Sequence, residues 1–183
     1  KPRPDSSYLV PELKSGVPEK NARQGRKLKI ADRLFDRGIN CPSDGVMKVY
    51  LSAPGKRFSA LLGVDSNDLG YYSSLGRGDL VVTIDVHGKE IFQSPVMREG
   101  QTAVPIDINL GGAADFTLRI TGKDGSIDLA DAKITQSNGH EIGLDDLPIG
   151  PLRADYAVGP PFSFVYGGKK SSEIMKDWTV QRS

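Results

Sequence analysis

Residues 57–64 have the sequence RFSALLGV, in which Phe58, Ala60, Leu62 and Val64 occupy every second position. Successive side chains of a β-strand point to opposite faces of its sheet, so these four apolar side chains share one face. The pattern is typical of a strand that buries one side against a hydrophobic core. The stretch therefore predicts a β-strand with one buried face.

The same alternation recurs along the chain on both sides of this stretch. Further strands are expected at 46–51, 80–86, 104–110, 116–120 and 132–134, where apolar residues recur between turn-forming glycines. No long segment has a helical period. Because each expected sheet has one apolar face that must be covered, the pattern predicts an all-β, jelly-roll-like antiparallel β-sandwich around one core.

The charge balance and the apolar content of the chain limit the classes of binding partner. The chain has 183 residues, with 24 Lys and Arg against 23 Asp and Glu, for a net charge of +1. This balance gives no field that favours nucleic acid or an anionic membrane. No apolar stretch approaches the roughly 20 residues that span a bilayer. The single cysteine, Cys41, has no partner within the chain for a disulfide. A start at Lys1 with no signal-peptide pattern suggests a processed or cloned fragment.

Four parts are expected along the chain. Prolines and basic residues in 1–26 indicate an extended N-terminal linker, in which only a short piece near Tyr8 packs on the body. The sandwich is expected over 27–136, and an irregular, proline-punctuated linker over 137–160. The apolar content of 161–183 indicates the start of a following domain or a strap across the sandwich.

Five segments that follow one another over roughly residues 30–136 resemble the NPCBM family of carbohydrate-binding modules. They are residues 57–68, 94–100, 104–113, 116–120 and 130–134. The resemblance implies a jelly-roll-like module without an active site, attached to glycoside hydrolases that often act on galactose-containing glycans. It also implies a secreted or periplasmic, bacterial-type protein. Residues 161–178 resemble the segment that follows this module in bacterial α-galactosidase-like proteins.

Two positions depart from the family pattern. Relatives commonly carry a histidine shortly after the glycine that corresponds to Gly38, where this chain has Pro42. They commonly carry a tryptophan before the Ala-Asp-Ala segment, where this chain has Leu129. Sugars usually stack on an aromatic ring, so the second departure removes a stacking platform if the family uses it in this way.

An oxygen-rich turn follows the first strand quoted above. Residues 65–68 have the sequence DSND, which suits either a calcium ion or sugar hydroxyls, or a turn that caps its own backbone. Asp128 and Asp131 belong to a second acidic cluster that is expected to join it at one end of the sandwich. Asp65, Asp68 and Asp131 are therefore the candidate ligands for calcium, the one cofactor considered.

Two tyrosines and an arginine complete the candidate glycan site. Tyr71 and Tyr72 lie in a glycine-flanked loop, either as a replacement stacking surface or tucked against the core. Arg98 either hydrogen-bonds a ligand or forms an internal ion pair. The predicted glycan-binding residues are Asp65, Asn67, Tyr71, Tyr72, Arg98 and Asp128.

The sequence offers no catalytic constellation. His87 and His140, the two histidines, both lie beside glycine in expected turns, and no triad or zinc spacing surrounds them. The favoured hypothesis is a non-catalytic module that binds a glycan, with galactose-type sugars expected, and that is joined to a catalytic domain. The alternative, motivated by Pro42 and Leu129, is a structural module that has lost sugar binding and packs on that domain.

Overall fold

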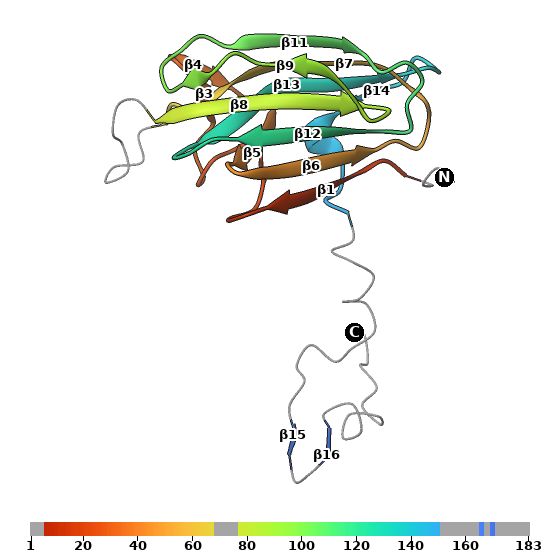
Figure 1. Cartoon of the computed structure of the whole chain (residues 1–183), viewed down its shortest axis with the longest axis horizontal. Coiled ribbons are helices and arrows are strands. Elements are labelled where there is room, and N and C mark those ends of the chain that lie inside the picture. The colour runs from red at the N-terminus through yellow and green to blue at the C-terminus, as the bar shows by residue number, and fades with distance from the viewer. Residues whose placement is uncertain (1–5, 68–76, 151–164, 167–168, 171–183) are drawn as a thin grey trace. The chain divides into compact units, whose positions relative to one another are not determined.

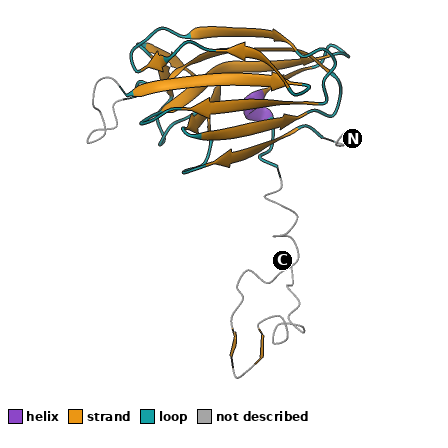
Figure 2. Cartoon of the chain, in the orientation of Figure 1, coloured by secondary structure: helices purple, strands orange, loops and turns teal. Residues whose placement is uncertain are grey.

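The alternating stretches pair into two sheets that lie face to face (Figure 1). The structure is a computed structural model that describes residues 6–67, 77–150, 165–166 and 169–170. The chain divides into two compact units, residues 1–150 and 151–183. Strands dominate the first unit, and their pairing confirms the predicted antiparallel β-sandwich (Figure 2).

Each sheet contains six strands. In spatial order, sheet 1 consists of β1 (Tyr8–Leu13), β6 (Gly45–Tyr50), β12 (Asp115–Thr121), β8 (Gly78–Val86) and β10 (Met97–Arg98), with β9 (Lys89–Gln93) also paired to β8. Sheet 2 consists of β11 (Val104–Asn109), β7 (Gly55–Val64), β13 (Ser126–Gln136), β5 (Gly38–Pro42) and β2 (Glu19–Lys20), with β14 (Glu141–Gly143) also paired to β13. A separate hairpin joins β3 (Leu28–Ile30) to β4 (Arg33–Phe35).

The core lies between the two sheets and follows the predicted alternation. Phe58, Ala60, Leu62 and Val64 of β7 are all buried. The Phe58 ring packs on Phe116 of β12, with ring centroids 5.1 Å apart, so the two sheets meet through aromatic side chains. The period of two thus identified the buried face of β7 correctly.

The N-terminal segment differs from the expected linker. Of residues 1–26, β1 pairs with β6 over six residues, and β2 pairs with β5. Leu9 is fully buried in the sandwich core. Pro11 is compatible with β1 because an edge strand does not need every backbone N–H for pairing. The sandwich therefore begins at Tyr8 rather than at residue 27.

The segment expected as an irregular linker also joins the sandwich. After β14, a short 3-10 helix, η2 (Leu144–Asp146), buries Leu144. The chain then runs parallel to β1: Leu9 N donates to Pro148 O at 2.9 Å, and Gly150 N donates to Leu9 O at 2.5 Å. The compact unit consequently extends to Gly150.

In the second unit, the structure describes one antiparallel pair, β15 (Val165–Tyr166) with β16 (Lys169–Lys170). The remaining positions of 161–183 lie outside the described residues. No helix in the described part of the chain has the length and apolar character to cross a membrane.

Leu9→Ala tests whether β1 belongs to the folded core. Removing a buried leucine side chain is expected to cost about 3 kcal/mol of unfolding free energy, measured by chemical denaturation. Glu12→Ala on the exposed face of the same strand is the matched control, with an expected change below about 0.5 kcal/mol. Equal effects of the two substitutions would contradict the placement of β1 in the sandwich.

Candidate functional site

Three polar side chains lie on the outer face of sheet 2, away from the core. Asn40 of β5 alternates with Ile39 and Cys41, which point into the core. Ser126 and Asp128 of β13 alternate in the same way with core residues, and the register places Asp128 opposite Asn40. The strand period therefore brings these three side chains together, although 86 residues separate Asn40 from Ser126.

A closed excursion of the chain covers this face. Asn21 N donates to Gly38 O, and Gly38 N donates to Asn21 Oδ1, each at 2.9 Å, so the two ends of the segment between them are joined. We call this segment, residues 22–37, the flap; it contains the β3–β4 hairpin. The closure at its base makes the flap a compact loop that packs as one unit.

The flap packs on sheet 2 through its own small hydrophobic cluster. Leu28, Ile30 and Phe35 are buried against Ala130 of β13, and Leu61 of β7 packs at the edge of the cluster. The flap thus removes the polar side chains beneath it from water. Burial of polar groups requires that they be hydrogen-bonded, and they are.

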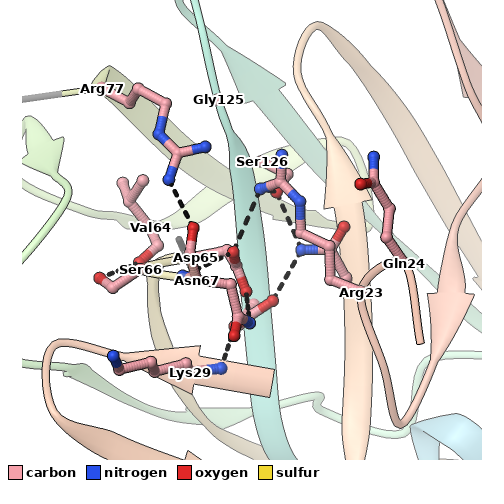
Figure 3. A network of polar contacts seen from close by, with 12 residues as sticks. Arg23, Gln24, Lys29, Val64, Asp65, Ser66, Asn67, Arg77, Gly125 and Ser126 are labelled. Atoms are coloured by element: carbon pink, nitrogen blue, oxygen red, sulfur yellow. Dashed lines mark hydrogen bonds and ion pairs between the residues drawn. The ribbon is translucent and has the colours of Figure 1, made fainter. Parts of the chain in front are cut away.

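Two carboxyl groups are buried beneath the flap, and hydrogen bonds hold both of them (Figure 3). Asp128 accepts from Asn40 Nδ2 at 2.7 Å and from Lys29 N at 3.0 Å. Asp65 accepts from Asn67 N at 3.1 Å and from Asn67 Nδ2 at 2.9 Å. The relative exposure is 0% for Asp128 and 1% for Asp65.

Burial raises the pKa of the Asp128 carboxyl to about 8. The charge of Asp65 and a hydrogen bond between the two carboxyl groups act in the same direction, whereas the donors Asn40 and Lys29 N oppose the rise in pKa. Asp128 is therefore largely protonated at neutral pH. Protonation of Asp128 removes one negative charge from the buried pair, which reduces the cost of desolvation.

Arg23 of the flap supplies the opposite charge. Its Nη1 lies 3.3 Å from Asp65 Oδ1 and also donates to Ser126 Oγ. Figure 3 shows the Arg23 side chain reaching from the flap to β13. Because Nη1 is held from both sides, the guanidinium has a fixed position. Its Nε and Nη2 have no hydrogen-bond partner among the described residues.

A second ion pair supports the other side of the network. Arg77 Nη2 lies 2.7 Å from Glu99 Oε1 and donates to the carbonyl oxygen of Asn67 at 2.8 Å. Hydrogen bonds from Arg77 hold the pKa of Glu99 below its usual range. The turn that carries Asp65 and Asn67 is thus fixed both to the flap and to the start of β8.

The network opens to solvent at a hollow of about 260 Å³. Arg23 and Gln24 of the flap form one wall, and Asn40 and Ser126 of sheet 2 form another. The full lining is Gly16, Val17, Glu19, Arg23, Gln24, Asn40, Pro42, Gly125 and Ser126. We call this hollow the flap pocket.

The flap pocket combines fixed polar groups with an apolar rim. Asn40 Nδ2 is committed to Ser126 and Asp128, while its Oδ1 accepts no hydrogen bond from the described residues. Val17 is 71% exposed at the rim. The pocket therefore offers free donors on Arg23, a free acceptor on Asn40 and an apolar contact, the combination that a hydroxylated ligand needs.

A second cavity, of about 200 Å³, lies elsewhere on sheet 2 and is lined by charged groups. Arg37 forms ion pairs there with Asp145 at 2.9 Å and with Asp146 at 2.7 Å. Asp131 and Lys133 also line it. The carboxylates near this cavity are partly neutralised by Arg37, and its described lining lacks an aromatic side chain.

The predicted site residues fall into three groups. Asp65, Asn67 and Asp128 do come together, but as buried supports beneath the flap rather than as a solvent-facing surface. Arg98 instead pairs with Asp79 at 2.6 Å. Asp68, Tyr71 and Tyr72 lie outside the described residues.

The two candidate calcium ligands in the described region are separated. Asp65 belongs to the buried network, whereas Asp131 lines the second cavity. Within the described ranges, no group of three or more His, Cys, Asp or Glu side chains is arranged to hold a metal ion.

Sequence reasoning missed Arg23, Asn40 and Ser126. Arg23 lay in a segment expected to be a linker, and Asn40 stood among apolar residues with no motif. The three side chains come together only when β5 pairs with β13, and no local pattern in the sequence predicts that pairing. Leu129, expected where relatives have a tryptophan, is fully buried in the core, whereas Pro42 lines the flap pocket.

Comparison with known proteins gives one family and several structural neighbours. The model of the NPCBM/NEW2 domain matches residues 5–135. A curated relative, "Putative endo-alpha-N-acetylgalactosaminidase" of Renibacterium salmoninarum, is 24% identical over 142 residues. The match covers 75% of this chain and 8% of that protein, so the chain spans a small part of its relative.

Two solved structures share the fold. The structure of CBM51-2 and INT domains from Clostridium perfringens ZmpB has a TM-score of 0.59 at 18% identity, with 68% of this chain and 29% of that chain covered. The CBM51 from Clostridium perfringens GH95, in complex with methyl-galactose, has a TM-score of 0.52 at 17% identity. The match covers 69% of this chain and 92% of that chain. The ZmpB module has also been solved in complex with GlcNAc.

Proposed function

The chain belongs to the NPCBM/NEW2 domain family, and on this premise we propose that it binds a glycan as a non-catalytic module of a larger glycoside hydrolase. We place the sugar in the flap pocket. One observation carries this assignment: Arg23 of the flap, Asn40 of β5 and Ser126 of β13 converge on one hollow. Buried carboxyl groups hold Arg23 and Asn40 in place before any ligand arrives, which lowers the entropic cost of binding.

A galactose-type sugar is the proposed ligand. A pyranose presents hydroxyl groups to Arg23 and Asn40 and an apolar face to Val17 and Pro42. The neighbouring modules solved with methyl-galactose and with GlcNAc support the choice of a neutral hexose. Pro42, where relatives carry a histidine, lines the same pocket, which supports its location.

Arg23→Lys tests the pocket as the sugar site. The lysine keeps the positive charge but lacks the fork of guanidinium donors, so the affinity for methyl-galactose is expected to fall about tenfold or more. The measurement is a titration of the full chain by calorimetry and by NMR shifts up to millimolar sugar, with GlcNAc in parallel. Arg119→Lys on the exposed face of sheet 1 is the matched control and is expected to bind like the wild type.

The outcomes separate the two proposed roles of the chain. If Arg98→Ala weakens binding and Arg23→Lys does not, the sugar binds near Arg98 and the flap pocket is the wrong site. If neither sugar binds the wild type, the alternative of a docking module that packs on the catalytic domain is favoured. The absence of an aromatic ring from the described lining of the pocket is the observation that keeps this alternative.

The remaining properties of the parent protein follow as proposals. We propose a secreted or periplasmic, bacterial-type enzyme that acts on galactose-containing glycans and resembles α-galactosidases. The resemblance of residues 161–178 and the relative from Renibacterium salmoninarum support this proposal. A calcium role for Asp65, Asp68 and Asp131 is tested by adding calcium and then chelator during the sugar titration, with affinity as the readout.

A further inference from the structure

The two walls of the flap pocket belong to different parts of the chain. Contacts outside the pocket hold these two parts together. Arg23 and Gln24 lie on the flap, whereas Asn40 and Ser126 lie on sheet 2. The hydrogen bond from Arg23 to Ser126 crosses between the two walls, as Figure 3 shows. The pocket therefore has its shape only while the flap is docked on the sheet.

The apolar part of the docking contact depends on a glycine. Gly63 of β7 lies beneath Ile30 of β3, and neither residue lines the pocket. A Cβ atom at Gly63 would overlap Ile30 Cγ2 and lie 3.2 Å from Cγ1 and 3.3 Å from Cβ. Only a hydrogen atom fits at this position, so the absence of a side chain at Gly63 lets the flap reach the sheet.

Backbone hydrogen bonds of the flap lie next to the contact between Gly63 and Ile30. Lys29 N donates to Asp128 Oδ2 at 3.0 Å, and Ala31 N donates to Ser66 Oγ at 3.1 Å. Ser66 N in turn donates to Lys29 O at 2.7 Å. These bonds flank Ile30 on both sides, so a methyl group that lifts Ile30 must lengthen or break them.

We propose that the flap pocket is assembled by docking of the flap on sheet 2, so that Gly63 and Ile30 act as positioning residues that set the affinity of the pocket from outside it. This inference rests on the proposed function, because it takes the sugar to bind in that pocket. Docking and binding are then thermodynamically linked: the sugar stabilises the docked flap, and an undocked flap weakens sugar binding.

Gly63→Ala is the primary test. It is expected to weaken the binding of methyl-galactose about tenfold or more and to speed amide hydrogen exchange at Lys29 and Ala31. The double variant Gly63→Ala/Ile30→Ala adds one methyl group at position 63 and removes the Ile30 side chain beyond Cβ, which relieves the overlap with Cγ2. It is expected to recover affinity to within about threefold of the wild type, as a coupled pair should. Ser59→Ala, on the same face of β7 but away from the flap, is the control.

The possible outcomes are distinguishable. Faster exchange with weaker binding, and recovery in the double variant, supports the proposal. Unchanged exchange in Gly63→Ala, or faster exchange with unchanged affinity, overturns it while the proposed sugar site stands. If the wild type binds neither sugar, the proposed function fails and this coupling fails with it.

Two additions keep the test decisive. Saturating sugar is expected to slow amide hydrogen exchange at Lys29 and Ala31 in the wild type. An exchange rate that does not change when sugar is added overturns the linkage. If Gly63→Ala does not fold, Ile30→Ala, which removes the Cγ1 and Cγ2 atoms that face Gly63, takes its place. It is expected to weaken binding about twofold, and an affinity equal to that of the wild type then overturns the proposal.

Discussion

Raising the pH from 5 to 8 is expected to lower the free energy of unfolding of the sandwich by roughly 3 to 4 kcal/mol. The cause is Asp128, because burial raises the pKa of its carboxyl to about 8 in the folded chain. In the unfolded chain the pKa returns to about 4. Between these values the folded state holds a proton that the unfolded state has released, so each pH unit costs about 1.4 kcal/mol.

The direction of the effect follows from the raised pKa. Below about pH 4 both states are protonated, and the full contribution is present. It is lost progressively as the pH rises and levels off above about 8. Glu99, Asp107 and Asp146 act in the opposite sense, since ion pairs lower their pKa values. Their contribution is lost only as the pH falls below about 4, outside this window.

The measurement is urea denaturation at pH 5, 6, 7 and 8, followed by far-ultraviolet circular dichroism. Asp128→Asn is the decisive variant, because a neutral amide cannot titrate, and its stability is expected to vary little over the window. Asp107→Asn, an exposed carboxylate on the same sheet, is expected to keep the wild-type slope. A wild-type slope near zero would show that Asp128 is ionised in the folded chain.

Gly38→Ala is expected to cost about 4 kcal/mol or more and to leave little folded protein at 37 °C. Gly38 has φ +143°, a backbone conformation that alanine avoids. A Cβ atom here would overlap the carbonyl oxygen of Leu129 and come 2.9 Å from Ala130 Cα. Both are backbone atoms of β13, which is paired on both sides and cannot retreat. The substitution would also disturb the base of the flap, where Asn21 and Gly38 bond.

Gly88→Ala shows how much of the stability loss at Gly38 comes from steric overlap and how much comes from backbone strain. Gly88 also has a positive φ, of +74°, but a Cβ atom there would meet nothing within 4 Å. The expected loss is about 1 kcal/mol from backbone strain alone. Thermal unfolding of both variants provides the measurement. Equal losses at the two glycines would show that the close approach of β13 does not matter.

The sandwich itself was predictable because its signal is local. Each strand carries its own alternation, as Phe58, Ala60, Leu62 and Val64 do in β7, and this pattern does not depend on the partner strand. The N-terminal strand was missed for the opposite reason. Prolines at 11 and 18 argued against a helix, and the short strand β1, which contains Pro11, shows no clear alternation; only its pairing with β6 explains the burial of Leu9.

The candidate site was only partly predictable, because its geometry is non-local. The acidic turn at Asp65 lies beside Asp128, because the end of β7 and the start of the antiparallel strand β13 lie side by side. Their burial was not foreseen, because it depends on the flap, which closes through the bonds between Asn21 and Gly38. The same closure places Arg23, which lies in a segment expected to be a linker, in the wall of the flap pocket.

The parallel pairing of Leu9 with Ile149 has a consequence for how such a unit can be combined with others. The point where the chain enters the sandwich and the point where it leaves are hydrogen-bonded neighbours. A unit with adjacent entry and exit can be inserted into a surface loop of an unrelated host without stretching that loop, and its ends can be joined by a short peptide in a circular permutant.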